Sequence, residues 1–483
     1  MKKETGITMI ALVVAIVVLL ILASITIGAV TSENGILRNA NDAKEQTEIA
    51  EEKEIVDRAT IQAMGNNSRG NIVEDELQKQ LDKITGNGKT ETDDVGEEFE
   101  VAFIENKRYY TVDKDGNVIG PQDIVEDKSP GDITVGKDGE TLNGSEEKPY
   151  EIWCIEDLVE WSNNYEDYQY NNINLCTNLN FKSKYSYANS KRTDYGDINA
   201  DNITDTLIQE MQKGKGFSPI NSFSGVFNGN RFEIENIYIV NSGNVGLFRK
   251  IEGAIICDLG ISGYIESTQI NNIQSGVGGI VGKTSAYTRY EKSDIDNCWN
   301  KATIKGALNN TYTGVGGIVG QASYKTDIVN CYNEGKVIGE IGEFLYSNTG
   351  IGVAGILGYT RGNYANVNIY NSYNSGNISS NKSSYGIMGG IWAEGTCNIE
   401  NCVNIGEAQI GICRTADNIS ANNIYYLDSV SNTGGITNAI AVSENELCSE
   451  QFIKTLNDYI NEETYKSNWK YWTLGEDGYP TFE

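Results

Sequence analysis

The stretch Gly276-Val-Gly-Gly-Ile-Val-Gly282 decides the fold, because it returns three more times along the chain. It recurs unchanged at 314–320, and in modified form as GVAGILG at 352–358 and GIMGGIW at 386–392. A second motif follows each copy: IDNCWN from Ile295, IVNCYN from Ile328, IYNSYN from Ile369 and IENCVN from Ile399. The isoleucines Ile280, Ile318, Ile356 and Ile391 mark a period of 38, 38 and 35 residues. A repeat of this length predicts a solenoid or array.

The pattern within each repeat indicates strands. Every apolar piece is short, rich in β-branched or small residues and bounded by Gly or Asn. We therefore predict a mainly β protein whose residues 149–440 form a parallel β-helix, with about two coils in each repeat unit. Glycine pairs would allow close turns at the corners. Helical segments are expected to cap this β-solenoid at CIEDLVEWSNN near its start and in a C-terminal cap at 441–483, where Ser443 and Glu446 form a capping-box pattern.

These repeats resemble the GLUG-motif proteins, a bacterial surface group with repeats of the form G-x-G-G-I-V-G followed by I-x-N-C-x-N. The resemblance begins upstream, at about Lys148, with KPYEIWCIEDLVEWSNN and FSPINSFSGVFNGNRFEIENIYI. It implies a surface-exposed β-solenoid and does not identify a ligand.

The N-terminal segment Ile7–Val30 carries no charged residue. A helix needs roughly 20 apolar residues to cross the hydrocarbon layer, so this segment is long enough to be a transmembrane helix. Lys2 and Lys3 precede it and acidic residues follow it. The positive-inside rule then predicts a single-pass protein in the cell membrane, with the region after Val30 outside the cell.

The order KKETGITMIALVV in this segment resembles the N-terminus of a type IV prepilin or pseudopilin. The resemblance implies a leader at 1–6, cleavage by prepilin peptidase after Gly6, N-methylation of Ile7 and assembly with other pilin subunits in a surface fibre. The family commonly has glutamate where this chain has Ala11. The protein would then be a minor subunit or would not polymerise. A plain, uncleaved membrane anchor is the alternative interpretation.

Residues 31–120 are expected to form a long helix and a small sheet, the arrangement of a pilin-like head. The segment NIVEDELQKQLDKITGNG has helical apolar spacing, and EEFEVAFIENKRYYTVDKDGNVIG has strand alternation on both sides of a turn. Residues 121–148 are acidic, contain glycine and are weakly apolar, so they are predicted to be a linker.

Composition excludes several functions. The net charge is −29 and the chain has no histidine, which argues against nucleic-acid binding and excludes Ser-His and Cys-His nucleophile pairs. No cofactor or metal is predicted. Calcium at the loop containing Asp194, Asp197, Asp201 and Asp205 is a less favoured alternative to a solvated acidic loop. Cys298, Cys331 and Cys402 share one repeat position, where another repeat has Ser372, so buried thiols are favoured over disulfides.

Two functions from different classes remain. The first is a pilin-like adhesin whose solenoid binds a carbohydrate or a host or other surface. The second is a structural subunit in which the solenoid is a spacer or self-association element. A polysaccharide-degrading β-helix enzyme is the least favoured alternative, and no catalysis is expected. Tyrosines in the variable segments favour binding, since their rings are apolar and their tips polar. These candidate binding residues are Tyr287, Tyr290, Tyr312, Tyr324, Tyr346, Tyr359 and Tyr364.

Overall fold

The computed structural model forms two compact units, 1–123 and 124–483. It describes residues 36–67, 71–94, 98–123, 131–137, 139–181, 216–270, 275–288, 290–309, 311–342, 350–362, 365–392, 394–461 and 466–482. The predicted leader, the predicted transmembrane segment Ile7–Val30 and the acidic loop at Asp194–Asp205 lie outside the described residues. None of the helices within those ranges is both long and apolar enough to cross a bilayer.

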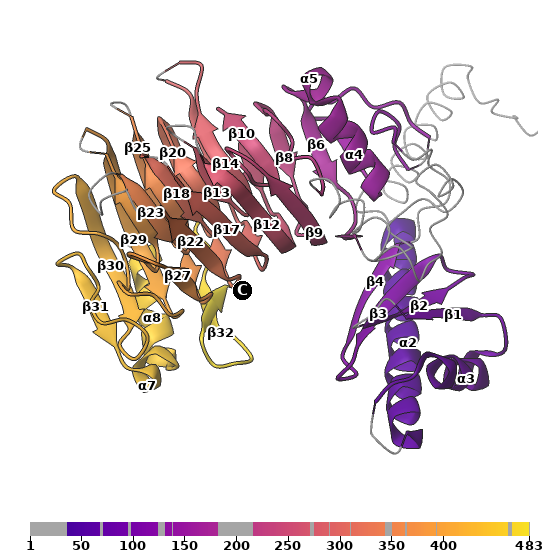
Figure 1. The fold of residues 1–483 in the computed structure, drawn as a ribbon. Helices are drawn as coiled ribbons and strands as arrows, with labels where there is room; N and C mark the ends of the chain where they lie inside the picture. Colours follow the sequence, from indigo (N-terminus) through magenta and orange to yellow (C-terminus); the bar gives the residue numbers. More distant parts are fainter. Residues whose placement is uncertain are drawn as a thin grey trace, which may run out of the picture. The chain divides into compact units, whose positions relative to one another are not determined.

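The first unit packs helices against an antiparallel sheet (Figure 1). Its elements are α2 (Ile36–Asn66), α3 (Glu74–Thr85), β1 (Thr90–Asp94), β2 (Glu98–Phe103), β3 (Arg108–Asp113) and β4 (Val118–Asp123). Val56 and Ala59 of α2 and Leu77 of α3 are fully buried against Val101 of β2. The apolar face of α3 and the strands β2 and β3 therefore form one small core, in which both strands are buried on both faces and do not alternate as expected.

A buried ion pair joins α2 to the sheet of this unit. Arg108 donates from Nε to Glu52 Oε2 at 2.9 Å and from Nη2 to Oε1 at 3.0 Å. Tyr110 Oη donates to Glu52 Oε2 at 2.9 Å. Glu52 and Arg108 are 3% and 7% exposed. The hydrogen bond to Glu52 raises the pKa of Arg108, so the guanidinium stays charged.

The second unit is a stack of parallel strands, the arrangement of a β-solenoid (Figure 1). One sheet contains β10 (Phe248–Glu252), β14 (Val281–Ser285), β19 (Val319–Ala322), β24 (Leu357–Thr360) and β28 (Met388–Ile391). We call it the front sheet. A short sheet contains β13 (Gly276–Gly278), β18 (Thr313–Gly316) and β23 (Ile351–Ala354).

The remaining parallel strands form one large sheet. It contains β5 (Tyr150–Ile152), β6 (Asn172–Leu175), β7 (Leu179–Asn180), β8 (Val226–Asn228), β9 (Glu233–Asn241), β11 (Ile255–Cys257), β12 (Gly260–Ile270), β15 (Lys292–Asp296), β16 (Trp299–Asn300), β17 (Thr303–Leu308), β20 (Lys325–Val329), β21 (Tyr332–Asn333), β22 (Val337–Ile341), β25 (Asn366–Tyr370), β26 (Tyr373–Asn374), β27 (Ile378–Ser380), β29 (Thr396–Asn404), β30 (Ile419–Leu427) and β31 (Ala439–Val442). Isoleucine, valine and leucine side chains from the three sheets fill the interior.

Strand register corrects two details of the sequence prediction. Gly276 pairs with Gly314 of the next repeat, so each repeat forms one coil and not about two. In the fourth copy, Leu357 pairs with Met388, and Ile387 accepts a hydrogen bond from the Ile356 amide at 3.2 Å. Ile387, not Ile391, is thus the equivalent of Ile356. Gly386 likewise corresponds to Gly355 and not to Gly352, so the sequence alignment of GIMGGIW with the other copies was offset.

Asparagine side chains explain the repeated glycines. Asn300, Asn333, Asn374 and Asn404, the last residues of the IxNCxN motifs, form a buried ladder. Each Nδ2 donates to the Oδ1 of the next asparagine at 2.7 or 2.8 Å. A Cβ at Gly279 would lie 2.6 Å from Asn300 Oδ1, and one at Gly317 would lie 2.4 Å from Asn333. The glycine therefore leaves room for the amide ladder.

The first asparagine of the same motif turns the chain between strands. Asn330, Asn371 and Asn401 adopt positive φ values of 53°, 46° and 54°. Their side chains form a second ladder, in which Asn371 donates to Asn330 at 2.8 Å and Asn401 to Asn371 at 2.7 Å. Asparagine tolerates this left-handed conformation better than most residues, and the ladder satisfies its amide.

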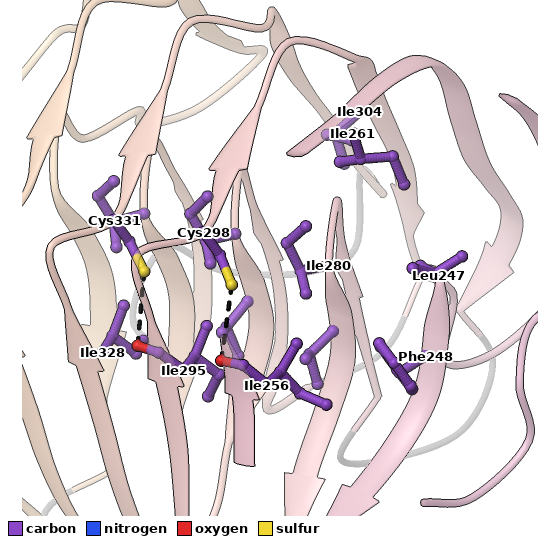
Figure 2. Close-up of a cluster of buried hydrophobic side chains, with 14 of the residues drawn as sticks. Leu247, Phe248, Ile256, Ile261, Ile280, Ile295, Cys298, Ile304, Ile328 and Cys331 are labelled. Atoms are coloured by element: carbon purple, nitrogen blue, oxygen red, sulfur yellow. Dashed lines mark hydrogen bonds between the residues drawn. The ribbon is translucent and has the colours of Figure 1, made fainter. Parts of the chain in front are cut away.

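The motif cysteines lie inside the solenoid. Cys298, Cys331 and Cys402 are fully buried and form no disulfide, as expected. Figure 2 shows Cys298 and Cys331 pointing toward the coils before them, where the carbonyls of Ile256 and Ile295 lie 3.6 and 3.5 Å from the two thiols. The nearer acceptors are the carbonyls two residues earlier in the chain, of Asp296 at 3.4 Å from Cys298 and of Val329 at 3.1 Å from Cys331. Ser372, the equivalent residue, donates to the Tyr370 carbonyl at 2.7 Å. A small side chain with one donor thus satisfies this position.

The start of the solenoid is covered by α4 (Ile155–Asn163) and α5 (Tyr165–Tyr168). Leu158 and Trp161 of α4 are fully buried in the solenoid core. The described part of the segment expected to be a linker also packs here. Ile133 is fully buried in that core, and its carbonyl accepts from the Glu151 amide at 3.2 Å.

The C-terminal cap comprises α7 (Glu444–Leu447), α8 (Glu450–Ile460), β32 (Trp472–Leu474) and β33 (Pro480–Phe482). Ser443 caps only the short α7, and Ser449 caps α8. The buried residues of α8 pack with Tyr373 and Tyr425, which lie on either side of Val403 in three stacked coils. The cap therefore covers the flank of the last coils. Trp472 and Phe482 of the cap pack against a stack of tyrosine rings on the solenoid, in which the ring centroids of Tyr332 and Tyr373 are 4.8 Å apart.

Candidate functional site

The structure separates the predicted binding tyrosines. Tyr287 and Tyr290 are 57% and 70% exposed, whereas Tyr312 and Tyr324 are half-buried. Tyr359 lies in β24 and is 1% exposed, so it is not the exposed loop residue that the sequence suggested. Tyr346 and Tyr364 lie outside the described residues. The variable segments do not therefore present one uniform row of exposed tyrosines in the described part of the chain.

Two of these tyrosines meet at a cavity over the front sheet. Its volume is about 540 Å³, which lies within the usual range for small-molecule sites. We call it the aromatic pocket. The ring centroids of Tyr312 and Tyr359 are 6.4 Å apart, and those of Tyr312 and Trp392 are 4.7 Å apart in an edge-on arrangement. The lining residues are Thr311, Tyr312, Gly350, Tyr359, Ile391, Trp392, Arg414, Thr415, Ala416, Asp417 and Asn418.

Neighbouring coils position the three rings. Tyr312 precedes β18, Tyr359 lies in β24 and Trp392 follows β28. The buried Gln321 donates to the Tyr312 carbonyl at 2.7 Å. The Trp392 amide donates to the Thr360 carbonyl at 2.9 Å, and Asn418 donates to the Trp392 carbonyl at 2.8 Å. The backbone on which each ring stands is thus tied to strands or to buried polar groups.

Gly350 allows the rings to approach. Its φ is +72°, and a Cβ there would lie 2.5 Å from Tyr359 Oη and 2.6 Å from Tyr312 Cδ1. The Gly350 carbonyl accepts from the Thr313 amide at 3.0 Å, which fixes this wall of the pocket. A side chain at residue 350 would therefore be strained and would push the rings apart.

Two arginines lie at the aromatic pocket, Arg414 in its wall and Arg361 against its aromatic rings. The guanidinium of Arg361 lies 4.1 Å from the Tyr312 ring centroid and 5.5 Å from that of Trp392. This is the geometry of a cation–π contact. Arg414 is half-buried in the wall, and Asp417 is exposed. Burial raises the pKa of Tyr359, so its hydroxyl stays protonated and able to donate a hydrogen bond.

Sequence reasoning missed Trp392, Arg361 and Arg414. Aligning GIMGGIW with the other copies placed Trp392 on a motif glycine within a strand, whereas the observed register places it beside Arg361, since Thr360 pairs with Ile391. Aligning Gly386-Ile387 with Gly355-Ile356, in place of Ile391 with Ile356, would have placed Trp392 beside Arg361. Arg414 lies after the last clear motif copy, where the repeat gave no signal.

A second cavity, of about 580 Å³, lies beside the cap hairpin. Glu334, Glu476 and Asp477 line it together with Tyr373 and Tyr479. Its charge is thus opposite to that of the aromatic pocket. Within the described ranges, no cluster of acidic, cysteine or histidine side chains is arranged to hold a metal ion.

Residues 311–338 match the model of the GLUG motif. The match includes Tyr312 of the pocket together with Gly317 and Asn333 of the ladder, and it supports the interpretation as a surface repeat region. None of the curated proteins matches the chain. The chain is similar to the crystal structure of a protein provisionally named an immunoglobulin A1 protease from Bacteroides ovatus. Identity is 19%, coverage is 71% of this chain and 95% of that chain, and the TM-score is 0.48.

Proposed function

We propose that the protein is a cell-surface adhesin whose β-solenoid binds carbohydrate in the aromatic pocket. The observation that carries the proposal is the convergence of Tyr312, Tyr359 and Trp392 on one cavity. A sugar ring has apolar C–H faces and polar edges. Aromatic rings cover such faces, while the side chains of Asn418 and Thr415 offer hydrogen bonds to the edges.

The construction of the pocket fits binding without large rearrangement. Each aromatic residue stands on or beside a strand of the stacked coils, and the Tyr312 and Trp392 carbonyls accept hydrogen bonds from side chains. Rigid aromatic residues lose little conformational entropy when a ligand binds. We expect no catalysis, because the chain has no histidine and the described residues that line the pocket include one carboxylate, Asp417.

The anchoring of the adhesin is part of the proposal. Ile7–Val30 would span the membrane and leave the solenoid outside the cell. Prepilin peptidase would process Gly6–Ile7, and other pilin subunits would be partners if the protein joins a fibre. Ala11 in place of the family's usual glutamate favours a minor subunit over a major one.

A glycan array tests the binding function. The full-length protein in detergent should bind a restricted set of glycans, and Trp392→Ala should remove that binding at an unchanged melting temperature. Tyr471→Ala is the matched control, since Tyr471 is 45% exposed and lies in the cap outside the aromatic pocket. Equal loss in both variants, or binding that survives Trp392→Ala, would contradict the pocket as the site.

One observation favours the structural alternative. Strand β31 pairs with β30, and no other described strand pairs with it, while its Ile440 is 48% exposed. An edge of this kind can accept a strand from a second copy. If the solenoid is a self-association element, the full-length protein should form oligomers that Ile440→Lys dissociates, as measured by mass photometry. Glycan binding would then be absent.

A further inference from the structure

The arginines of the aromatic pocket lack carboxylate partners in the described structure. Neither Arg361 nor Arg414 forms an ion pair with a described residue, although the chain has 67 acidic residues against 38 basic ones. Nη1 of Arg361 is buried without a hydrogen-bond partner there. A buried donor without a partner is unfavourable unless a ligand or water satisfies it. Arg414 is the arginine in the pocket wall, and its charge is not neutralised by an ion pair with any described carboxylate.

The two guanidinium groups have different surroundings. The guanidinium of Arg361 lies over the Tyr312 ring and near that of Trp392, so it already contacts the aromatic rings. Arg414 lies in the pocket wall and makes no hydrogen bond or ring contact within the described residues. Its forked donors are the ones available for a planar anion, which arginine binds through two parallel hydrogen bonds.

Further positive charge lies on the same sheet. Lys283 of β14 pairs in register with Gln321 of β19, which pairs with Tyr359 of β24. Burial and the neighbouring Lys250 and Arg361 lower the pKa of Lys283, so these cations lie close enough to interact, although Lys250 is itself paired with Glu252 at 3.1 Å. Asp417 is the one carboxylate among the described residues that line the pocket, and it is exposed. The local charge is thus opposite to that of the whole chain.

We propose that the aromatic pocket binds an acidic saccharide, with Arg414 holding the carboxylate of the sugar. This inference rests on the proposed carbohydrate-binding function and specifies its ligand class. Trp392 and Tyr312 cover the sugar ring, and Arg361 keeps the two rings in place while adding positive potential. Neutral glycans lack the group that Arg414 holds, so the pocket discriminates between acidic and neutral forms of one sugar.

Matched pairs of saccharides test the proposal by titration calorimetry on the full-length protein. The probes are trigalacturonic acid against its methyl ester, and 3′-sialyllactose against lactose. We expect at least one acid to bind about 10- to 100-fold more tightly than its neutral partner, the range for a hydrogen bond to a charged group. This preference should weaken with added NaCl.

Variants assign the preference to Arg414. Arg414→Gln should remove the discrimination and leave weak binding of the neutral sugar, whereas Arg414→Lys should keep part of it. Lys336→Gln is the control for charge, because Lys336 is exposed and lies between β21 and β22, outside the pocket. All variants should melt at the same temperature.

The outcomes separate the two proposals. Equal binding of acidic and neutral sugars, or discrimination that persists in Arg414→Gln, overturns the acidic-saccharide inference and leaves carbohydrate binding standing. The acidic-saccharide inference is also overturned, and carbohydrate binding still stands, if neutral glycans on the array bind through Trp392 and neither acid binds. If no glycan of either kind binds, carbohydrate binding and the acidic-saccharide inference fail together.

Discussion

Gly317 and Asn333 are complementary: a Cβ built on the glycine would lie 2.4 Å from the side-chain amide of the asparagine. Both residues fall within the GLUG-motif match. The glycine of the GVGGIVG motif and the final asparagine of the IVNCYN motif that follows it in the same repeat are therefore one structural unit. The asparagine supplies a hydrogen-bonded ladder through the interior, and the glycine leaves the volume that the ladder occupies.

Gly317→Ala should therefore destabilise the solenoid. The added methyl group would also lie 2.1 Å from the Gly355 carbonyl oxygen, so backbone must shift. We expect a loss of about 1–3 kcal/mol in the free energy of unfolding, or more if the coil cannot adjust. Urea denaturation followed by circular dichroism measures it. Gly65→Ala is the control, because nothing lies within 4 Å of a Cβ there and alanine favours helix. An unchanged solenoid in Gly317→Ala would contradict the steric explanation.

The buried thiols give a prediction about pH. Burial raises the pKa of Cys402 to about 12 and that of Cys298 well above its ordinary value. Alkylation of these cysteines in the native protein should be slow, and should not accelerate between pH 7 and 10 as an ordinary thiol does. Rapid modification should appear only in denaturant, as followed by mass spectrometry of the alkylated peptides. Disulfide-linked peptides containing Cys298, Cys331 or Cys402 would contradict this result.

The same shift predicts a loss of stability in alkali. A thiol such as Cys402 keeps its proton in the folded state up to about pH 12 but releases it near pH 9 when unfolded. Its contribution is fully present below pH 9 and is lost as the pH rises toward 12. Cys402→Ser should reduce this alkaline loss and remain folded, because Ser372 already occupies the equivalent position. Melting temperatures measured from pH 8 to 11 test the expected slope.

The repeat predicted the solenoid because stacking requires like residues at like positions, and the sequence records that requirement directly. It could not predict the aromatic pocket. Tyr312, Tyr359 and Trp392 come from different coils, and their meeting depends on a register that the sequence alignment misplaces in the last motif copy. Burial of Tyr359 also depends on neighbouring segments covering the front sheet, which a pattern of strand residues does not encode.

N-terminal processing remains a prediction from the first residues. If the prepilin resemblance holds, the mature chain begins at Ile7 and carries an N-methyl group. Mass spectrometry of the N-terminal peptide, from cells that contain the peptidase, tests this directly. Gly6→Val should block cleavage and leave the leader attached. An intact Met1 start in the unmodified protein would favour the plain membrane anchor.

The ion pair of the first unit gives a prediction independent of the solenoid. Glu52→Gln should remove the nearer of the two carboxylates that pair with the buried guanidinium of Arg108, leaving Glu48 at 3.5 Å, and should weaken the bond from Tyr110. Breaking a buried pair by removing one partner destabilises by about 3–5 kcal/mol. Hydrogen exchange should therefore accelerate in peptides covering α2 and β3 while the solenoid keeps its protection. Glu105→Gln, which removes an exposed ion pair with Lys89, should leave exchange unchanged. Equal exchange in both variants would show that the Glu52–Arg108 pair does not hold the helix to the sheet.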